Sequence, residues 1–398
     1  MDYQTILNKA KEYEAETAEI LARLVQTPSF SGKEKEVADL ICDEMRKNGF
    51  DSVRIDGLGS VIGTIGNGPR TMAFDAHIDT VYPGERGNWK FDPFAGKIED
   101  GFVLGRGASD QKAGMASMIT AGRMIKELKL NDKFTVLFTG TVMEEDCDGL
   151  CWHYLISEEK VRPELVVSTE PTSLNIYRGH RGRMEMTIEV KGVSCHGSAP
   201  ERGDNAIYKM ARIALEIERL NERLKTDSFL GKGTICASVF ESGSPSQCAV
   251  ADFARIQVDR RLTNGENRES AVAELQDCAV RAGCPGAVVK VLHYDATAYT
   301  GMKFGMDKYF PTWVLDEKST WISDAESAYH SLFGKDPLID KWTFSTNGIA
   351  TAGMHGIPTM GFGPGDEVQA HAPNERARIS DLSAAAAFYA GLVHKLNG

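Results

Sequence analysis

The chain lacks the features of a membrane-spanning, secreted or disordered protein. No window contains the ~20 consecutive apolar residues that a membrane-spanning helix requires. The segment from Met1 to Glu19 is charged throughout and has no apolar centre of a secretion signal. Of the 398 residues, 42% are hydrophobic and 25% are charged, which is typical of a folded globular protein. We therefore expect a cytoplasmic protein without a membrane partner.

Paired cysteines are also missing. None of the eight cysteines stands in a CxxC pair, and their scattered spacing in a chain of this length predicts reduced thiols. They are Cys42, Cys147, Cys151, Cys195, Cys236, Cys248, Cys278 and Cys284.

There is no excess of positive charge. The 45 Lys and Arg residues face 56 Asp and Glu residues, which gives a net charge of −11. An acidic chain without a basic, aromatic stretch argues against nucleic acid as a partner. Solubility explains most of the excess acid, and some of the acids belong to the candidate site described below.

The first part of the chain alternates helical segments with short buried strands. The expected helices cover residues 3–26, 34–48 and 113–128, and the expected strands cover residues 71–74, 134–139 and 165–168. Strands that alternate with helices predict an α/β fold with a mainly parallel central sheet flanked by helices.

The pattern changes near residue 178. Residues 185–190 alternate apolar and polar side chains, as in a half-exposed antiparallel strand. The elements expected next are a helix at 205–224, a strand at 254–262, a helix at 268–282 and a strand at 287–293. This βαββαβ-like order predicts a small α+β domain inserted into the first. From about residue 296 the first domain resumes with a helix at 323–333, a strand at 359–362 and a helix at 380–396. The predicted domains are therefore 1–179, 180–295 and 296–398.

Acids and histidines stand at the ends of the predicted strands, where ligands bind in open α/β sheets. His77 and Asp79 lie two apart, so both project from one face of an extended segment. A neutral imidazole is a good zinc ligand, and the carboxylate can hold its other nitrogen. A hydrogen-bonded pair at a strand end explains the two residues equally well.

Four further residues belong to the candidate site. Asp110 lies in a glycine-rich turn, where it is either a ligand or a helix N-cap. Glu144 and Glu145 follow a buried strand, and adjacent acids there favour a cation over a solvated loop. Glu170 ends another apolar strand.

A late histidine, His371, follows a glycine-rich segment. Each of these signals is weak alone, because a single histidine or acid is more often structural. Together, two histidines and three carboxylates form a ligand set that suits zinc, with cobalt and manganese as alternatives. They suffice for two metals ~3.5–4 Å apart, and leave Glu144 or Glu145 free as a base.

These segments resemble, in order and over essentially the whole chain, the dinuclear zinc family of aminoacylases, acetylornithine deacetylases, succinyl-diaminopimelate desuccinylases, dipeptidases and glutamate carboxypeptidases. The family pattern is HxD, GxxD, EE, EP and a late His. Its counterparts here are His77/Asp79, Asp110, Glu144/Glu145, Glu170 and His371.

The resemblance implies a zinc-peptidase-like catalytic domain with an inserted ferredoxin-like dimerisation or lid domain, and two divalent metal ions per chain. The implied ligands are Asp110 as the bridge, His77 and Glu170 at one metal, and Glu145 and His371 at the other. Glu144 is then the general base, and Asp79 orients His77.

The small domain carries a second motif. The segment around His196 resembles the family's GxxxHxxxP, in which the histidine reaches the partner subunit's active site and supports the oxyanion. We therefore expect a homodimer in which His196 acts in trans. Cys248 stands where relatives have a substrate-holding Asn, and its segment resembles a branch labelled selenium-metabolism-linked hydrolases.

The expected reaction is hydrolysis of an amide bond in an N-acyl or N-carbamoyl amino acid or a short peptide. Arg260 or Arg261, with the loop that contains Gly363 and Gly365, provides candidates for holding a substrate carboxylate. A TIM-barrel amidohydrolase is a poorer match because the usual HxH pair is absent. A catalytically silent relative that binds a ligand or a partner is the remaining alternative.

Overall fold

The computed structural model describes residues 2–398, which divide into two compact units. The chain up to Gly179, Asp295–Phe304 and Val314–Gly398 form the first unit, and His180–Tyr294 and Gly305–Trp313 form the second. We had expected residues 305–313 in the returning part of the first domain. They belong to the second unit because strand β17 in this segment pairs with strand β9 there.

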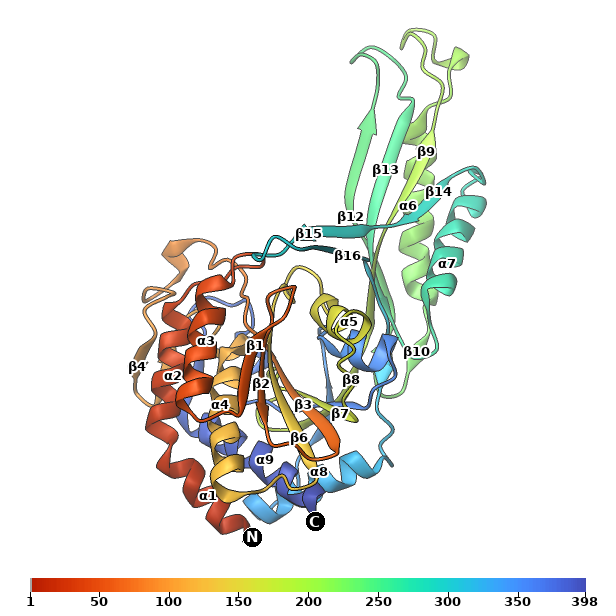
Figure 1. Ribbon diagram of the computed structural model, residues 1–398. Coiled ribbons are helices and arrows are strands. Elements are labelled where there is room, and N and C mark those ends of the chain that lie inside the picture. The colour runs from red at the N-terminus through yellow and green to blue at the C-terminus, as the bar shows by residue number, and fades with distance from the viewer. Residues whose placement is uncertain (1) are drawn as a thin grey trace. The chain divides into compact units, whose positions relative to one another are not determined.

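A nine-stranded mixed sheet lies at the centre of the first unit (Figure 1). Strands β6, β3, β7 and β20 are neighbours and run parallel, while β2 and β8 flank them in antiparallel orientation. The expectation of a mainly parallel centre is confirmed. The strands are β1 (Ser52–Ile55), β2 (Val61–Ile65), β3 (Arg70–His77), β6 (Phe134–Thr141), β7 (Leu165–Ser168), β8 (Ile176–His180), β18 (Trp313–Val314), β19 (Ile339–Trp342) and β20 (Thr359–Gly361).

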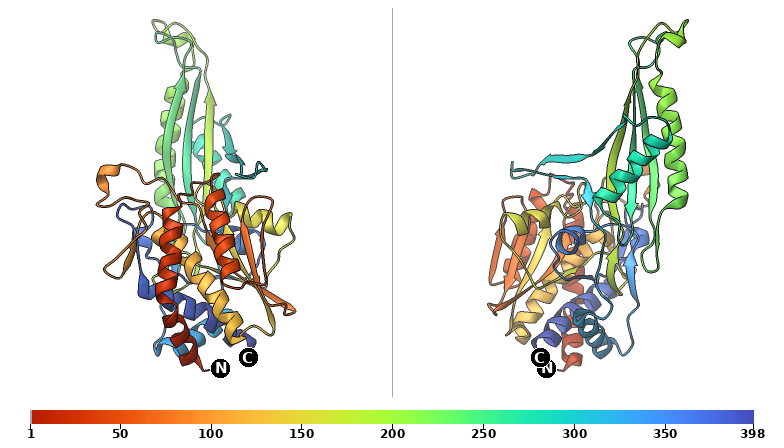
Figure 2. Two further views of the ribbon diagram at one scale, coloured as in Figure 1. Left: turned by 60° about the vertical axis from the view of Figure 1, so that its left-hand side comes forward. Right: turned by 90° about the vertical axis from the view of Figure 1, so that its right-hand side faces the viewer.

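Helix α9 packs against α1, α2, α4 and α8, and these helices gather on one side of the sheet (Figure 2). The helix expected over 3–26 is two helices that meet at Tyr13, whose hydroxyl donates to Glu127 Oε2 on α4 at 2.6 Å. The helices of this unit are α1 (Tyr3–Glu12), α2 (Glu14–Gln26), α3 (Lys35–Lys47), α4 (Ala113–Leu128), α5 (Leu150–Ser157), α8 (Thr320–Phe333) and α9 (Ile379–Asn397).

Aromatic side chains fill the core between this sheet and α9. Phe74 of β3 stacks on Phe138 of β6 with ring centroids 5.4 Å apart, and Phe362 stacks on Phe388 of α9 at 3.7 Å. The Tyr389 hydroxyl donates to the carbonyl oxygen of Phe362 at 2.8 Å. Aromatic pairs stabilise by about 0.5–1.5 kcal/mol beyond their buried area. The packing therefore fixes β3, β6 and the end of β20 relative to one another.

The second unit has the strand and helix order β9-α6-β12-β13-α7-β14, with an antiparallel sheet in the order β12-β13-β9-β14. Burial alternates along β13, so one face of the sheet packs on the helices and the other faces away. This arrangement agrees with the expected ferredoxin-like α+β domain. The elements are β9 (Gly182–Lys191), α6 (Ala206–Arg223), β12 (Thr234–Gly243), β13 (Phe253–Leu262), α7 (Arg268–Arg281), β14 (Val288–Val291) and β17 (Tyr309–Phe310).

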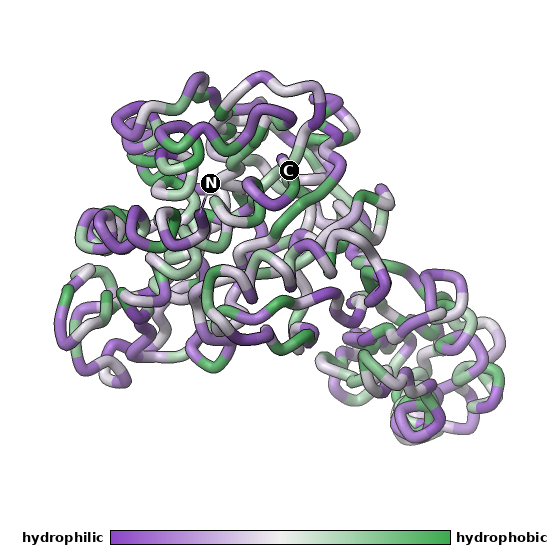
Figure 3. Tube along the Cα trace, turned by 90° about the horizontal axis from the view of Figure 1, so that it is seen from below, coloured by the Kyte–Doolittle hydropathy of each residue, from purple (hydrophilic) through white to green (hydrophobic). Residues whose placement is uncertain are grey.

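Smaller sheets complete the fold. One contains three strands, and two others are two-stranded. Their strands are β4 (Lys97–Glu99), β5 (Phe102–Leu104) and β21 (Arg376–Arg378); β10 (Thr226–Asp227) and β11 (Gly231–Lys232); and β15 (His293–Thr297) and β16 (Lys303–Asp307). No helix within residues 2–398 combines the length and the apolar content that crossing a membrane requires, and hydropathy changes every few residues along the trace in Figure 3.

Candidate metal centre

The parallel strands bring the predicted ligands to one edge of the central sheet. His77 is the last residue of β3, Glu144 and Glu145 come just after β6, and Glu170 comes just after β7. His77 pairs in register with Thr141, the last residue of β6. Because parallel strands all end at the same edge, these side chains converge where α/β sheets bind ligands.

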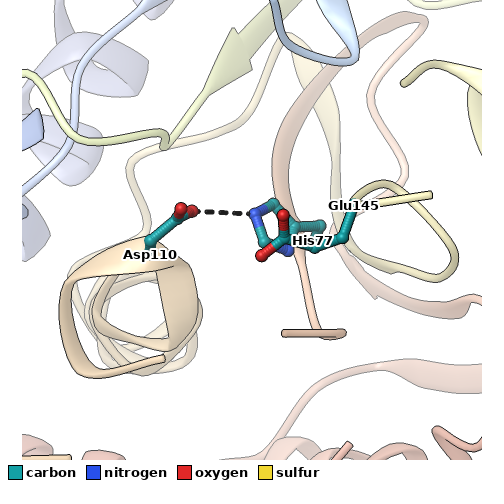
Figure 4. A group of neighbouring side chains, drawn as sticks. All are labelled: His77, Asp110 and Glu145. Atoms are coloured by element: carbon teal, nitrogen blue, oxygen red, sulfur yellow. Dashed lines mark hydrogen bonds and ion pairs between the residues drawn. The ribbon is translucent and has the colours of Figure 1, made fainter. Parts of the chain in front are cut away.

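Asp110 reaches this edge from the turn that precedes helix α4. Its Oδ1 lies 3.0 Å from His77 Nε2, and Figure 4 shows the two side chains facing one another with Glu145 beside them. His77 Nε2 is also 3.8 Å from Glu170 Oε1 and 4.0 Å from Glu144 Oε2. His77 therefore stands among several carboxylates.

His371 approaches the other oxygen of Asp110. His371 Nε2 lies 3.5 Å from Asp110 Oδ2 and 2.8 Å from Glu145 Oε2. Asp110 thus presents one oxygen to each histidine, which is the arrangement expected of a carboxylate that bridges two cations. The sequence-predicted ligands are all brought together here.

The site contains two groups of three possible ligand atoms, and within each group all three atoms lie within 4.8 Å of one another. One set comes from His77, Asp110 and Glu145, and the other from His77, Glu144 and Glu170. Glu144, which we expected as the base, is thus nearly as close to His77 as Glu170 is.

Burial shapes the protonation of this group. It raises the pKa of Glu144 and of Glu170 well above the usual range, and neighbouring carboxylates add to the rise while His77 opposes it. Burial lowers the pKa of His77, but the carboxylates of Glu144 and Asp110 outweigh it and raise that pKa well above 6.5. So many buried acids are unfavourable without a positive charge among them.

Unpaired oxygen atoms fit the same interpretation. Glu144 Oε1 and Glu170 Oε2 are buried and have no hydrogen-bond partner among residues 2–398. An orphaned buried acceptor is costly unless a cation or a water satisfies it. The imidazole and carboxylate donors suit zinc, cobalt or manganese. The residues therefore fit a pair of divalent cations.

Asp79 holds the site in a way the sequence did not reveal. Its main-chain carbonyl, 2.9 Å away, accepts the Nδ1–H of His77, whereas its carboxylate lies 3.6 Å from that nitrogen. The carboxylate accepts the amide protons of Glu144 and Glu145 at 3.2 and 3.1 Å. Asp79 thus orients His77 through its backbone and fixes the acidic loop through its side chain.

Glu375 and Arg106 were not among the predicted site residues. Fully buried Glu375 accepts the Arg106 guanidinium at 2.7 Å and the amides of Gly107, Ser109 and Asp110 at 2.8–2.9 Å. Burial raises the pKa of Glu375 to about 7. Gly107 has a φ of 82°, which a side chain would disfavour. Charged residues close to Asp110 and His371 in the sequence were the available signal.

Gly363 and Gly365 pack against the ligand segments. A β-carbon on Gly363 would lie 2.2 Å from the carbonyl oxygen of Glu170, and one on Gly365 would lie 2.4 Å from that of Ser109. The Gly363 amide donates to Thr172 Oγ1 at 2.9 Å. These glycines therefore allow close approach of the backbone, and their contact with a substrate carboxylate stays a prediction.

Arg260 is a correction to the predicted substrate residues. Its side chain is fully buried in the second unit and is paired with Glu266 at 2.7 Å and Glu274 at 3.0 Å. A guanidinium that is paired in this way is not open to a substrate carboxylate. Arg261 is partly exposed and pairs with Asp259 at 2.8 Å.

His196 and Cys248 lie side by side in the second unit. Residues 196 and 249 form an antiparallel bridge, and the Gly197 amide donates to the carbonyl oxygen of Cys248 at 2.6 Å. The exposed His196 ring accepts the Ser198 amide at Nδ1, 3.2 Å away. In the neutral tautomer that accepts this amide, the ring proton lies on Nε2.

Known proteins resemble this chain over most of its length. The sequence model of peptidase family M20/M25/M40 matches residues 73–395. The uncharacterized protein YgeY of Escherichia coli K12 is 53% identical over 391 residues, covering 98% of this chain and 96% of that protein. The succinyl-diaminopimelate desuccinylase of Methylocella silvestris is 27% identical over 400 residues, covering 94% of this chain and 97% of that protein. The solved YXEP protein of Bacillus subtilis has a TM-score of 0.73 at 16% identity, covering 97% of this chain and 99% of that one.

Proposed function

The chain belongs to peptidase family M20/M25/M40, a family of metal-dependent hydrolases, and we propose that it cleaves the amide bond of an N-acyl or N-carbamoyl amino acid or a short peptide. The family resemblance and the fold expected from the motif order are confirmed. The observation that carries the proposal is the position of Asp110, which offers one carboxylate oxygen to each of the two histidines. Deacylase names among the relatives support amide hydrolysis.

The proposed cofactors are two divalent cations. Zinc is the first choice, and cobalt and manganese are alternatives. His77, Glu170 and Asp110 would hold one, and His371, Glu145 and Asp110 the other. The solved Bacillus subtilis neighbour is described as a dinuclear metal-binding peptidase, which supports the count. Such a pair of cations lowers the pKa of water and polarises a carbonyl group.

Glu144 is the proposed general base. Its buried carboxylate takes the proton of the attacking water and passes it to the leaving amine. Burial raises the pKa of Glu144, and cations bound beside it would lower that pKa again, towards the value that a base needs near neutral pH. His196 would donate its Nε2 proton to the oxyanion of the tetrahedral intermediate, since Nδ1 is occupied as an acceptor.

The proposed assembly is a homodimer in which each His196 serves the partner's site. Strand β12 lies at the edge of its sheet and exposes apolar side chains, with Val239 at 43% and Phe240 at 52%. On helix α6 of the same unit, Tyr208 is 67% exposed. A long exposed edge strand is usually covered by another chain or protected. A second copy is the proposed cover.

The substrate carboxylate is assigned to Arg261. With Arg260 buried and paired, Arg261 is the remaining candidate of the two. Burial lowers the pKa of Arg181, and the charge of Arg261 lowers it further. The positive charges of two such guanidinium groups would attract a substrate carboxylate. Cys248, beside His196, is a further proposed substrate contact, because it stands where relatives have a substrate-holding Asn.

Elemental analysis and a hydrolysis panel test the proposal together. The purified chain is loaded with zinc, cobalt or manganese and offered N-acyl amino acids, N-carbamoyl amino acids and dipeptides. We expect about two metals per chain and release of an amine that chelators abolish. Two bound metals without turnover of any substrate would favour the alternative, a catalytically silent binding protein. Failure to bind metal, with no turnover, would overturn the hydrolase proposal and leave the family fold in a binding role.

A further inference from the structure

Glu34 is a buried carboxylate that neither the sequence motifs nor the family match includes, since the match begins at residue 73. It lies immediately before helix α3 (Lys35–Lys47) and is fully buried. A buried carboxylate is costly to keep unless hydrogen bonds or charges compensate it. Its contacts therefore indicate what it does.

The nearest helix does not use this carboxylate. An acid at the N-cap usually accepts an amide proton from the first turn of its own helix. Glu34 occupies the N-cap of α3, yet its side chain makes no capping hydrogen bond there. Helix capping therefore does not explain Glu34.

Glu34 instead reaches the loop that carries the two central acids. Its Oε1 accepts the amide of Met143 at 3.1 Å and that of Gly32 at 2.9 Å. Met143 has a φ of 60°, a left-handed conformation that is uncommon for a residue with a side chain. Met143 immediately precedes Glu144, so this bond fixes the backbone where the acidic pair begins.

Asp79 continues the same pattern. Its carboxylate accepts the next two amides, those of Glu144 and Glu145, so three consecutive amides donate to two buried carboxylates. The Ser31 hydroxyl donates to Asp79 Oδ2 at 2.7 Å, which joins the segment before α3 to the same cluster.

We propose that Glu34 is a positioning residue of the metal centre: together with Asp79 it fixes the backbone of residues 143–145 so that the Glu144 and Glu145 carboxylates face the metals. The segment 29–34 is then part of the catalytic apparatus, although it is remote in sequence from every ligand. The inference rests on the metal centre of the proposed function and not on the identity of the substrate.

Glu34→Ala and Glu34→Gln test the proposal. Glu34→Ala leaves the Met143 amide without an acceptor, whereas the glutamine carbonyl can still accept it. We expect Glu34→Ala to weaken metal binding, measured by competition with a chelator, by about tenfold or more. Turnover should fall with little change in KM. Glu34→Gln should restore both properties to near the wild-type level.

Glu44 supplies the matched control. It is a buried acid within helix α3, paired with Arg23 at 2.9 Å. Glu44→Ala should lower the melting temperature without changing metal affinity. A folded Glu34→Ala chain with wild-type metal affinity would overturn the proposal, and so would a Glu34→Gln chain as defective as Glu34→Ala. Because affinity is measured without substrate, a chain that binds metal but hydrolyses nothing would refute the proposed reaction and leave this inference open to test.

Discussion

His371 Nε2 lies 2.8 Å from Glu145 Oε2, although 226 residues separate them in the chain. The imidazole is 56% exposed and the carboxylate only 6% exposed. His371 also has a positive φ of 58°, which turns the chain sharply at this point. An exposed histidine thus meets a buried acid cluster, and the Glu145–His371 half of the centre is the half that faces solvent.

His371→Ala should therefore remove one metal and leave the fold intact. The exposed ring contributes little packing, so the melting temperature of the metal-free chain should change little, while bound metal should fall from about two to about one per chain. Elemental analysis after dialysis checks this result. His330→Ala is the control, because His330 is an exposed histidine paired with Asp336 on the surface. Full retention of both metals would show that His371 is not a ligand.

Glu144→Gln should abolish turnover while both metals remain bound. Loss of a general base typically lowers the rate by about 10²–10⁴-fold. The measurements are kcat and metal content of the same preparation, with Glu145→Gln as the comparison that should lose metal. Since Glu144 Oε2 lies 4.0 Å from His77 Nε2, loss of metal from Glu144→Gln would mean that the two glutamates exchange roles.

Glu375→Ala should strongly destabilise the protein. The substitution strands the buried Arg106 charge and three amides, and breaking a buried ion pair costs about 3–5 kcal/mol. Urea unfolding measures the free energy of unfolding. Glu375→Gln keeps an acceptor and should lose less. A loss below about 1 kcal/mol for Glu375→Ala, typical of an exposed pair, would contradict this account of the Asp110 turn.

Mixing two inactive chains should restore activity if His196 acts in trans. Chains with Glu144→Gln and chains with His196→Ala would each be inactive as homodimers. Random mixed dimers contain one site with both residues intact, so co-expression should give about a quarter of the wild-type activity. Activity assays on the purified mixture, with size-exclusion chromatography to confirm dimers, provide the measurement. No recovery from a verified heterodimer would place His196 in its own chain's site or outside catalysis.

Asp56 should make stability depend on pH. Burial raises its pKa to about 6, above the value of about 3.9 expected in the unfolded chain. The contribution of Asp56 to the free energy of unfolding is therefore fully present below pH 3.9 and is lost as the pH rises through 6. Asp56→Asn keeps an acceptor for the Gly59 and Ser60 amides but does not ionise.

The free energy of unfolding of the wild type, relative to that of Asp56→Asn, should accordingly fall by about 2 kcal/mol between pH 4 and pH 8. Urea unfolding at several pH values gives this difference directly. A difference that does not vary with pH would mean that Asp56 titrates normally.

The sequence alone determined the elements with strong periodicity and the residues with a motif. Strands β3, β6 and β7 were expected because continuous apolar runs are buried on both faces, and β9 and β13 because their alternation matches a half-exposed sheet. Strands β1, β2 and β12 were not expected. Strand β12 is largely exposed and therefore has no buried stripe to mark it.

The motif order also predicted a ligand set for the metal centre, because each of its members stands at a recognisable strand end or turn. The predicted ligands are His77, Asp110, Glu145, Glu170 and His371. The structure brings these five residues together: parallel strands end at one edge of the sheet, and the segment that contains His371 returns to Asp110 and Glu145 there.

Only the tertiary structure decided which charged residues serve the site and which serve the core. Arg260 and Arg261 are adjacent in the sequence, yet one is enclosed between two glutamates and the other is partly exposed, because neighbours on a strand face opposite sides of the sheet. Glu34 and Glu375 support the site through backbone amides, and every residue except proline supplies an amide donor. Such contacts leave no pattern in the sequence. Only the tertiary structure therefore shows that Glu34 contacts the backbone before Glu144 and that Glu375 contacts the turn at Asp110.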